Sequence, residues 1–304
     1  MDDMLIFGSK MHVTNETKNM LKSHFDMKDI GEANYILSMK ITKVCDRIFL
    51  DQSHYAKKIL RKYNFHDHKS VATPFDSSVH LFPMNNDDVI FNQKDYASII
   101  GSLHYVTDCT RPDIAYVVGM LSRFTSKASK DHWLAIEQVM RYLIDTKSYD
   151  LFYKKYPAVI EAFSDADWNT LSGDSLSIIG YIFTLGSGAI CWKSKKQTII
   201  ANSTMEAELI ALASTSEKAN WLRDLLHEIP LWEKPIPPIL NHCDSNATIC
   251  RVKNCYYNGK FRPIRRKHSI VRSHLSSSII TVDYVKSNDN LADSFTKGLA
   301  QDRV

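Results

Sequence analysis

The chain has 304 residues, of which 44% are hydrophobic and 24% charged, and its formal net charge is +4. This length exceeds one typical domain of roughly 100–200 residues, so two units are expected, each long enough to bury a core. The composition is typical of a soluble globular protein, and no run approaches the ~18 apolar residues of a membrane span. Because the start, Met1-Asp2-Asp3, is acidic where a signal peptide needs a basic region, a cytoplasmic or nuclear location is expected.

The cysteines show no C-x-x-C spacing of the kind found in zinc and redox sites. They occupy positions 45, 109, 191, 243, 250 and 255. Cys191 and Cys243 lie within apolar, strand-like runs, as buried thiols do. Since cytosolic and nuclear thiols stay reduced, all six are expected to be free rather than paired in disulfides.

The first half of the chain carries few strong element signals. Residues 1–9 place two carboxylates before a short apolar run, as in a β-hairpin. Residues 129–147 form an amphipathic pattern, because apolar groups recur at i, i+3, i+4 and i+7, namely Ile136, Val139, Met140 and Leu143. This spacing predicts a helix, in which His132 and Trp133 are interpreted as packing residues.

The second half begins near Tyr156-Pro157, where proline marks a boundary. Gly186-Ser187-Gly188 predicts a hairpin turn, a short helix should follow Ser245, and a closing helix is expected over 288–299. Strands are predicted over residues 159–164, 178–185, 188–192, 197–201, 239–243 and 279–285. Three antiparallel strands followed by alternating helix and strand predict an α/β fold, a mixed sheet flanked by helices.

A further helix is predicted to begin at Ser203. Ser203 and Glu206 form the S-x-x-E pattern of a capping box, in which the Glu206 carboxylate is expected to fold back to the amide of the N-cap residue. Glu206 thus has a structural task. Glu208, two residues further along, is left unexplained by capping.

Four acidic segments follow one another in the order known from one nuclease family. They are Phe163–Trp168, Ser203–Ala211, Cys243–Asn246 and Asn290–Lys297. Together they resemble the D-E-D-D constellation of ribonuclease H, in the version carried by copia-type retrotransposon polyproteins, and the tail (257–268, 282–287) resembles plant elements. The resemblance implies a ribonuclease H-like domain over 156–304 that hydrolyses the RNA strand of RNA/DNA hybrids.

By this resemblance the catalytic and metal-binding residues are Asp165, Glu208, Asp244 and Asp293. Hydrolysis of a phosphodiester at neutral pH needs a bound hydroxide and a Lewis acid on the leaving oxygen, which two Mg²⁺ ions about 4 Å apart supply. Hard Mg²⁺ prefers oxygen ligands, so carboxylates suffice, with Mn²⁺ as a substitute. Glu208 is preferred to Glu206 because of the capping role of Glu206 and because Glu-Leu-Ile-Ala resembles the family's catalytic glutamate.

The first part resembles the copia-type reverse transcriptase. The resemblance rests on residues 25–37, Thr73-Pro74 and residues 96–116. It makes Asp2 and Asp3 the last two letters of the polymerase's Y-x-D-D turn. Since the third metal-binding carboxylate lies upstream of this sequence, polymerase activity is not expected, and residues 1–155 are predicted to be the end of the palm, the thumb and the connection of a truncated polymerase.

Basic residues gather where a nuclease would touch its substrate. Between Tyr257 and Val282 there is no acidic residue, whereas six basic ones occur: Lys260, Arg262, Arg265, Arg266, Lys267 and Arg272. Together with Lys193, Lys195 and Lys196 they are predicted to contact phosphates. An RNA/DNA hybrid would be recognised by its shape and 2′-hydroxyls.

Two other functions stay open at this stage. The chain is alternatively an inactive retrotransposon relic that binds nucleic acid without cleavage, or a scaffold that uses the fold for protein contacts. The presence of all four acids favours the enzyme. His268 and His274 are interpreted as packing or phosphate-contacting residues and not as catalytic ones.

Overall fold

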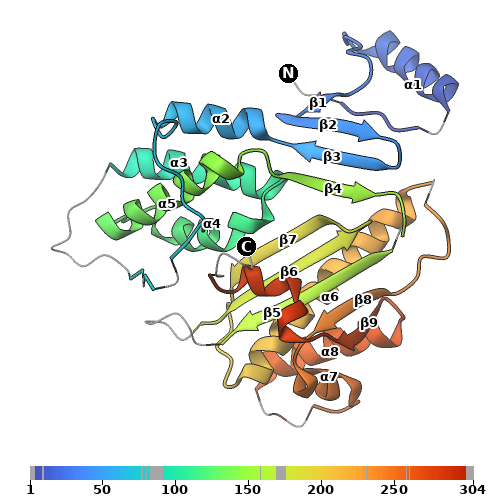
Figure 1. The fold of residues 1–304 in the computed structure, drawn as a ribbon. Coiled ribbons are helices and arrows are strands. Elements are labelled where there is room, and N and C mark those ends of the chain that lie inside the picture. The colour runs from blue at the N-terminus through green and yellow to red at the C-terminus, as the bar shows by residue number, and fades with distance from the viewer. Residues whose placement is uncertain are drawn as a thin grey trace.

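The computed structural model contains two β-sheets and two main hydrophobic cores, one among the helices of the first half and one on the second sheet (Figure 1). The structure describes residues 4–8, 10–76, 78–79, 81–82, 92–157, 159–168, 176–230, 232–257, 259 and 261–298. All six cysteines lie in these ranges and are free thiols, as expected. In the described part of the chain, no helix combines the length and the apolarity needed to cross a membrane.

The first sheet is antiparallel and has the order β1-β2-β3-β4. Its strands are Tyr35–Ile36, Met39–Val44, Arg47–Asp51 and Asp150–Lys154. The last strand joins from far along the chain, with Phe152 opposite Phe49 and the two rings 5.2 Å apart. The helical segment between β3 and β4 therefore begins and ends at two neighbouring strands of this sheet.

Helices between β3 and β4 build the first core, which contains Tyr96, Leu103 and Leu121 among its fully buried side chains. They are α2 (Ser53–Lys62), α3 (Gln93–Cys109), α4 (Ala115–Leu121) and α5 (Lys130–Thr146), with the 3-10 turns η1 (Pro112–Ile114) and η2 (Ser122–Phe124). Helix α1 (Met11–His24) buries no residue and lies apart from the helical core at the edge of the molecule (Figure 1).

Helix α5 confirms the amphipathic pattern at 129–147. Its N-cap Ser129 donates its backbone N–H to Nδ1 of His132 at 2.9 Å, and the buried His132 ring lies 3.9 Å from the ring of Phe124. Trp133 is half-buried and donates to Glu137 at 2.7 Å. Both aromatic side chains have structural roles.

The predicted hairpin over residues 1–9 is wrong in its described part, since residues 4–8 form no strand. A short apolar run is not stable as a strand without neighbours that pair with it. Asp2 and Asp3 lie outside the described residues.

The second sheet is mixed and has the order β7-β6-β5-β8-β9. Its strands in chain order are β5 (Ile160–Asp167), β6 (Ile178–Leu185), β7 (Gly188–Lys196), β8 (Ile239–Cys243) and β9 (Ile280–Tyr284). The first three are antiparallel, and β8 runs parallel to both β5 and β9. Gly186 and Ser187 both have positive φ, of 57° and 68°, as the predicted tight hairpin turn requires.

Helices cover the second sheet. On one face α6 (Thr204–Glu228) packs against β5 and α8 (Arg262–Ser276), with α7 (Asn246–Lys253) beside them. The opposite face carries the 3-10 turns η3 (Ser287–Asp289) and η4 (Leu291–Phe295), drawn in red in front of the sheet in Figure 1. This is the predicted α/β class, a ribonuclease H-like mixed sheet flanked by helices.

Two predicted elements of this half are wrong. Residues 197–201 are not a strand, because the Gln197 side chain donates to Ala207 O at 3.0 Å and the segment turns into α6. The closing helix expected over 288–299 is absent from its described part, residues 288–298, which contains η3 and η4 instead. Asn290 separates them, since its side-chain oxygen accepts the N–H of Ala292 at 3.1 Å and caps η4.

The two halves of the molecule share a third apolar cluster, on the sheet face opposite α6. It contains Ala115, Leu151, Ile182, Ala189 and Phe295. Polar contacts accompany it: Trp192 Nε1 donates to Thr107 O at 3.1 Å, and the Tyr153 hydroxyl donates to Ala189 O at 2.6 Å. The first half therefore covers part of the face on which η4 lies.

Candidate active site

Three carboxylates converge at one end of the second sheet. Asp165 lies near the end of β5, and Asp244 directly follows the neighbouring parallel strand β8. Asp293 is contributed by η4. One carboxylate oxygen from each of the three lies within 4.8 Å of the other two. The parallel pairing of β5 and β8 explains the meeting of the first two, because both strands end at the same edge of the sheet.

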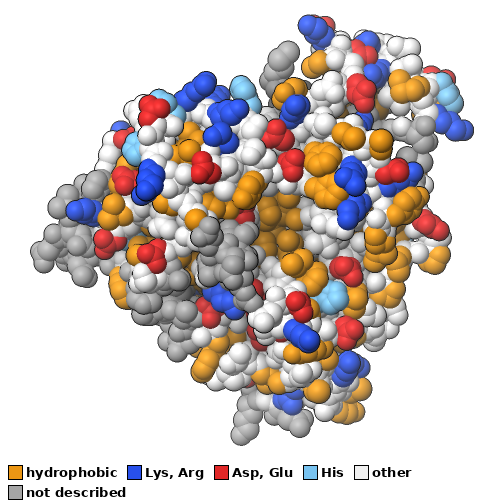
Figure 2. Space-filling view, viewed as in Figure 1, with side chains coloured by type: hydrophobic (Ala, Val, Ile, Leu, Met, Phe, Trp, Pro, Cys, Tyr) orange, Lys and Arg blue, Asp and Glu red, His pale blue; other side chains and the backbone are white. Residues whose placement is uncertain are grey.

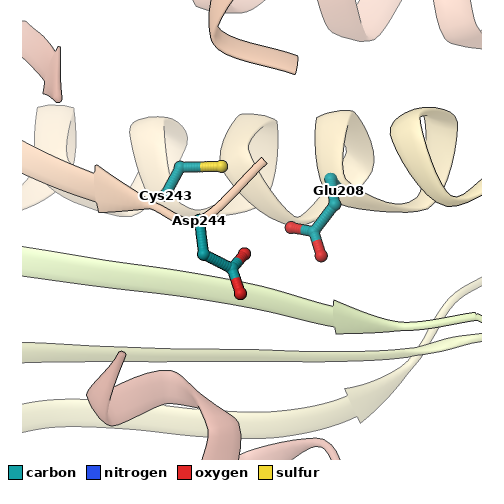
Figure 3. A group of neighbouring side chains, drawn as sticks. All are labelled: Glu208, Cys243 and Asp244. Carbon is teal, nitrogen blue, oxygen red and sulfur yellow. The ribbon is translucent and has the colours of Figure 1, made fainter. Parts of the chain in front are cut away.

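Glu208 reaches the same place from α6. Its Oε1 accepts the backbone N–H of Ala166 at 3.2 Å, while Oε2 is buried without a hydrogen-bond partner in the described structure. Only 4% of Glu208 is exposed. Figure 3 shows its carboxylate beside that of Asp244, with the Cys243 thiol next to them, and one donor atom of each lies within 4.8 Å of the others. All four predicted acids are thus brought together.

A close approach of η4 to the sheet completes the site. Gly180, the residue opposite Asp165, makes this approach possible, because a Cβ there would lie 2.7 Å from Cβ of Phe295 and 2.8 Å from Ala292 O. Asn290 fastens η4 to β5 by donating its side-chain amide to Ser164 O at 3.1 Å. Any side chain at position 180 would push Asp293 away from Asp165.

Thr296 fixes Asp165 directly. Its hydroxyl donates to Asp165 Oδ2 and also lies 3.1 Å from the backbone oxygen of Asp293. Thr296 is fully buried. A single hydroxyl thus links the strand carboxylate to the turn that carries the fourth acid.

The electrostatics of the site favour a cation. Burial, with Asp293 and Asp244 adding to it, raises the pKa of Asp165 to about 6 although the Thr296 hydrogen bond opposes the rise. Burial and then the charges of Asp165 and Asp244 raise the pKa of Glu208 well above its usual range. The ammonium of Lys297 lies 2.9 Å from Asp293 Oδ2. One lysine cannot balance four acids, so the cluster fits hard divalent cations that bind oxygen.

Glu206 has the structural role predicted for it, with a different partner. Ser203 Oγ accepts the N–H of Glu206 at 3.3 Å, as in a capping box. Oε2 of Glu206 instead accepts the N–H of Asn202, at 2.9 Å, and not that of Ser203, while Oε1 accepts the hydroxyl of Tyr257 at 3.1 Å. The prediction that Glu206 accepts the amide of the N-cap Ser203 is therefore wrong, since the donor is the preceding residue, Asn202.

The basic residues of β7 divide between the two faces of the sheet. Ser194 shares the register row of Asp165, so Lys196 lies on the face of Asp165, whereas Lys193 and Lys195 lie on the face of α6. Lys193 and Lys195 are exposed, and Lys196 is half-buried. Only Lys196 shares a sheet face with Asp165.

The basic residues of α8 also differ from one another. Arg262, Arg265 and Arg266 are exposed, whereas Lys267 is paired with Glu217 at 3.3 Å. Arg272 donates to Val252 O at 3.2 Å, which makes it a link between α8 and α7. Lys260 lies outside the described residues. On the face drawn in Figure 2, lysine and arginine side chains are scattered among acidic ones and form no single patch.

In the described structure, no hydrogen bond or ion pair joins either histidine of α8 to one of the four acids. His268 is buried, and its Nε2 lies 3.0 Å from Arg251 O. Burial lowers the pKa of the half-buried His274. The sequence predicts no role for Gly180, Asn290, Thr296 or Lys297. The last three lie in the segment that contains Asp293, whereas no local pattern indicates that Gly180 contacts η4.

The fold and the four converging acids define a ribonuclease H-like α/β unit preceded by a second, helical and antiparallel unit. Residues 1–77 match the family model described as "Reverse transcriptase (RNA-dependent DNA polymerase)". The chain is 34% identical over 303 residues to the retrovirus-related Pol polyprotein from transposon TNT 1-94 of Nicotiana tabacum, covering 97% of this chain and 23% of that protein. It is 32% identical over 301 residues to the Pol polyprotein from transposon RE2 of Arabidopsis thaliana, covering 99% and 20%.

The chain belongs to the family of copia-type retrotransposon Pol polyproteins, and its relatives include plant elements. It spans about a fifth of the length of these two polyproteins. Among solved structures, the foamy viral protease-reverse transcriptase in complex with dsDNA is similar with a TM-score of 0.47 and 15% identity, over 81% of this chain and 45% of that one.

Proposed function

We propose that this protein is a ribonuclease H, which hydrolyses the RNA strand of RNA/DNA hybrids with the help of divalent cations, Mg²⁺ or in its place Mn²⁺. The observation that carries the proposal is the convergence of Asp165, Glu208, Asp244 and Asp293 from four different elements at the end of a ribonuclease H-like sheet. Family membership supports it. We propose residues 156–304 as the nuclease domain and 1–155 as a domain related to the end of the reverse transcriptase.

The residues present fit two hard cations. Asp165, Asp244 and Asp293 offer converging oxygens, and Glu208 Oε2 is buried without a partner in the described structure, which is costly unless a cation joins it. When bound, the cations would supply an activated water and would neutralise charge on the leaving oxygen. All four acids would hold them.

The surrounding residues orient these acids. The Thr296 hydroxyl donates to Oδ2 of Asp165 and so restricts the rotation of that carboxylate. The backbone N–H of Ala166 fixes Glu208, and Asn290 ties η4 to the sheet. A site that is oriented in this way before the substrate arrives needs little rearrangement during the reaction.

Phosphate contacts would come from exposed basic side chains. Arg262, Arg265 and Arg266 on α8 are exposed and form no ion pair with any described residue, and Lys196 lies on the face of Asp165. Since an A-like hybrid is recognised by its shape and 2′-hydroxyls, we expect little base preference.

The test uses the full chain and three duplexes of one sequence: an RNA/DNA hybrid, double-stranded RNA and double-stranded DNA. We expect cleavage of the RNA strand of the hybrid with Mg²⁺ or Mn²⁺ and of neither other duplex. EDTA or Asp165→Asn should abolish it, while Asp165→Asn leaves the circular dichroism spectrum unchanged. Hybrid binding without cleavage would instead identify a nucleic-acid-binding relic, and cleavage that persists in EDTA would contradict a metal-dependent site.

A further inference from the structure

The Cys243 thiol is a feature that hydrolysis by hard cations does not use. Cys243 ends β8, is fully buried, and directly precedes Asp244. Its sulfur lies within 4.8 Å of a carboxylate oxygen of Asp244 and of Glu208. In Figure 3 the three side chains gather between the end of β8 and α6. Magnesium has little affinity for sulfur, so the thiol is not expected among its ligands.

A second observation indicates a ligand at this place. Oε2 of Glu208 is buried without a hydrogen-bond partner in the described residues, and the side chain is 96% buried. Its other oxygen is occupied by the N–H of Ala166. The buried Glu208 carboxylate thus lies beside the sulfur and the Asp244 carboxylate, and one of its oxygens has no hydrogen-bond partner among the described residues.

We propose that Glu208, Cys243 and Asp244 form a second, overlapping metal site, which takes a thiophilic divalent cation such as Zn²⁺ or Cd²⁺ and thereby blocks the nuclease. One sulfur and two carboxylate oxygens are an accepted ligand set for these cations, with water as a fourth ligand. Bond lengths of about 2.3 Å to sulfur and 2.0–2.2 Å to oxygen put neighbouring ligand atoms roughly 3.5 Å apart. Side-chain adjustments on the order of 1 Å would close the site.

Binding and inhibition have separate causes. On binding, the Cys243 S–H bond breaks, the sulfur–metal bond forms and the proton leaves to solvent. Because Glu208 and Asp244 belong to both sites, the thiophilic cation would remove two of the four acids from Mg²⁺. The binding is independent of the nuclease activity, whereas the inhibition rests on the proposed function.

Cadmium alone is the probe, since a Cd²⁺–thiolate bond gives an ultraviolet charge-transfer band. The full chain is used with its exposed cysteines, at 45, 250 and 255, replaced by serine to remove background. We expect one Cd²⁺ per chain, a band that Cys243→Ser abolishes, and a band that the matched control Cys191→Ser retains. Cys191 is half-buried on β7.

Other outcomes are informative. Glu208→Gln should weaken Cd²⁺ binding while Cys243 is intact, and excess Mg²⁺ should compete. If Cys243→Ser fails to fold by circular dichroism, Glu208→Gln and Cys243→Ala replace it. In cleavage assays Cys243→Ser should need roughly tenfold more Cd²⁺ for half-inhibition, because the soft ligand is gone. No band, or an undiminished band in Cys243→Ser, overturns the proposal. A band in a chain that cleaves no hybrid would overturn only the proposed function.

Discussion

The two halves of the molecule differ in whether their buried charged side chains have partners of opposite charge. In the first half, Arg111 is 3% exposed, and its guanidinium pairs with Asp113 at 2.6 Å and donates to Thr146 O at 2.8 Å. The Tyr142 hydroxyl donates to the same Asp113 carboxylate at 2.8 Å. A buried ion pair of this kind is closed and neutral, with hydrogen bonds to both partners.

Among the described residues of the second half, the buried carboxylates have no buried lysine or arginine beside them. Asp165, Glu208 and Asp293 are 6%, 4% and 6% exposed, and Asp244 lies beside them. Lys297 pairs with Asp293 alone among these acids. Like charges that burial brings together destabilise the fold unless a cation joins them. The compensated pair around Arg111 has a structural role, and the acids of the second half are those we propose as the active site.

The largest effect should come from removing one member of the uncompensated set. Glu208→Gln keeps the shape and the acceptor for Ala166 but removes a negative charge, so cleavage should fall by about 10³-fold or more while the melting temperature stays equal or rises. Hybrid cleavage and thermal melts check this.

Glu206→Gln is the matched control on the same helix. Its carboxamide oxygen can still accept from Asn202, and the cost should be well below ~1 kcal/mol with activity retained. An active Glu208→Gln beside a folded but inactive Glu206→Gln would reverse the assignment.

Removing Arg111 from its ion pair with Asp113 should destabilise the first half without changing the residues proposed for cleavage. Arg111→Leu leaves the half-buried Asp113 carboxylate without its cation and removes the buried bonds to Thr146, so the free energy of unfolding should fall by about 3 kcal/mol. Arg61→Leu, on the exposed face of α2, should change it by less than about 0.5 kcal/mol. Urea denaturation measures both, and equal effects would show that the Arg111 network has no special role.

The pH dependence of stability should reveal the uncompensated acids. The folded pKa of Asp165 is raised to about 6 from 3.8, so between these values the folded state holds a proton that the unfolded state has lost. Without metal, stability should therefore fall as pH rises from 4 to 6, by on the order of 2 kcal/mol. Asp165→Asn should flatten this part of the profile, and a wild-type profile that rises over the same range would contradict it.

Thr296→Val should reduce cleavage less than Glu208→Gln does, because Thr296 acts through Asp165. Thr296→Val keeps the volume and loses the hydroxyl, so cleavage should drop about 10–100-fold and need more Mg²⁺. Thr296→Ser should restore most of the activity. If valine and serine variants behave alike, the hydroxyl does not position Asp165.

The sequence predicts the local parts of this site well. Asp165 and Asp244 follow apolar runs that are strands in the structure, Ser203 and Ser245 are helix N-caps, and the turn at Gly186 is present. These elements depend on residues close together in sequence, so periodicity and capping patterns predict them.

The remaining parts depend on contacts between distant segments. Gly180 matters only because η4 packs on it, more than 100 residues later, and Thr296 matters only because it meets Asp165. Strand β4 likewise pairs with β3 from about 100 residues away. The Glu206 carboxylate accepts hydrogen bonds from Asn202 and Tyr257 and none from the N-cap amide in the described structure. Contacts with distant segments determine these interactions, and no pattern of neighbouring residues predicts them.

The most direct measurement is a pair of melting temperatures, in EDTA and in Mg²⁺, for the wild type and Asp165→Asn. If the four acids are an uncompensated cation site, the variant melts above the wild type in EDTA, because one repulsive charge is gone. Magnesium then raises the melting temperature of the wild type by more than that of the variant, so that the wild type melts at the higher temperature in Mg²⁺. A variant that melts below the wild type in EDTA, with no Mg²⁺ effect on either protein, would show that these acids are structural and bind no metal.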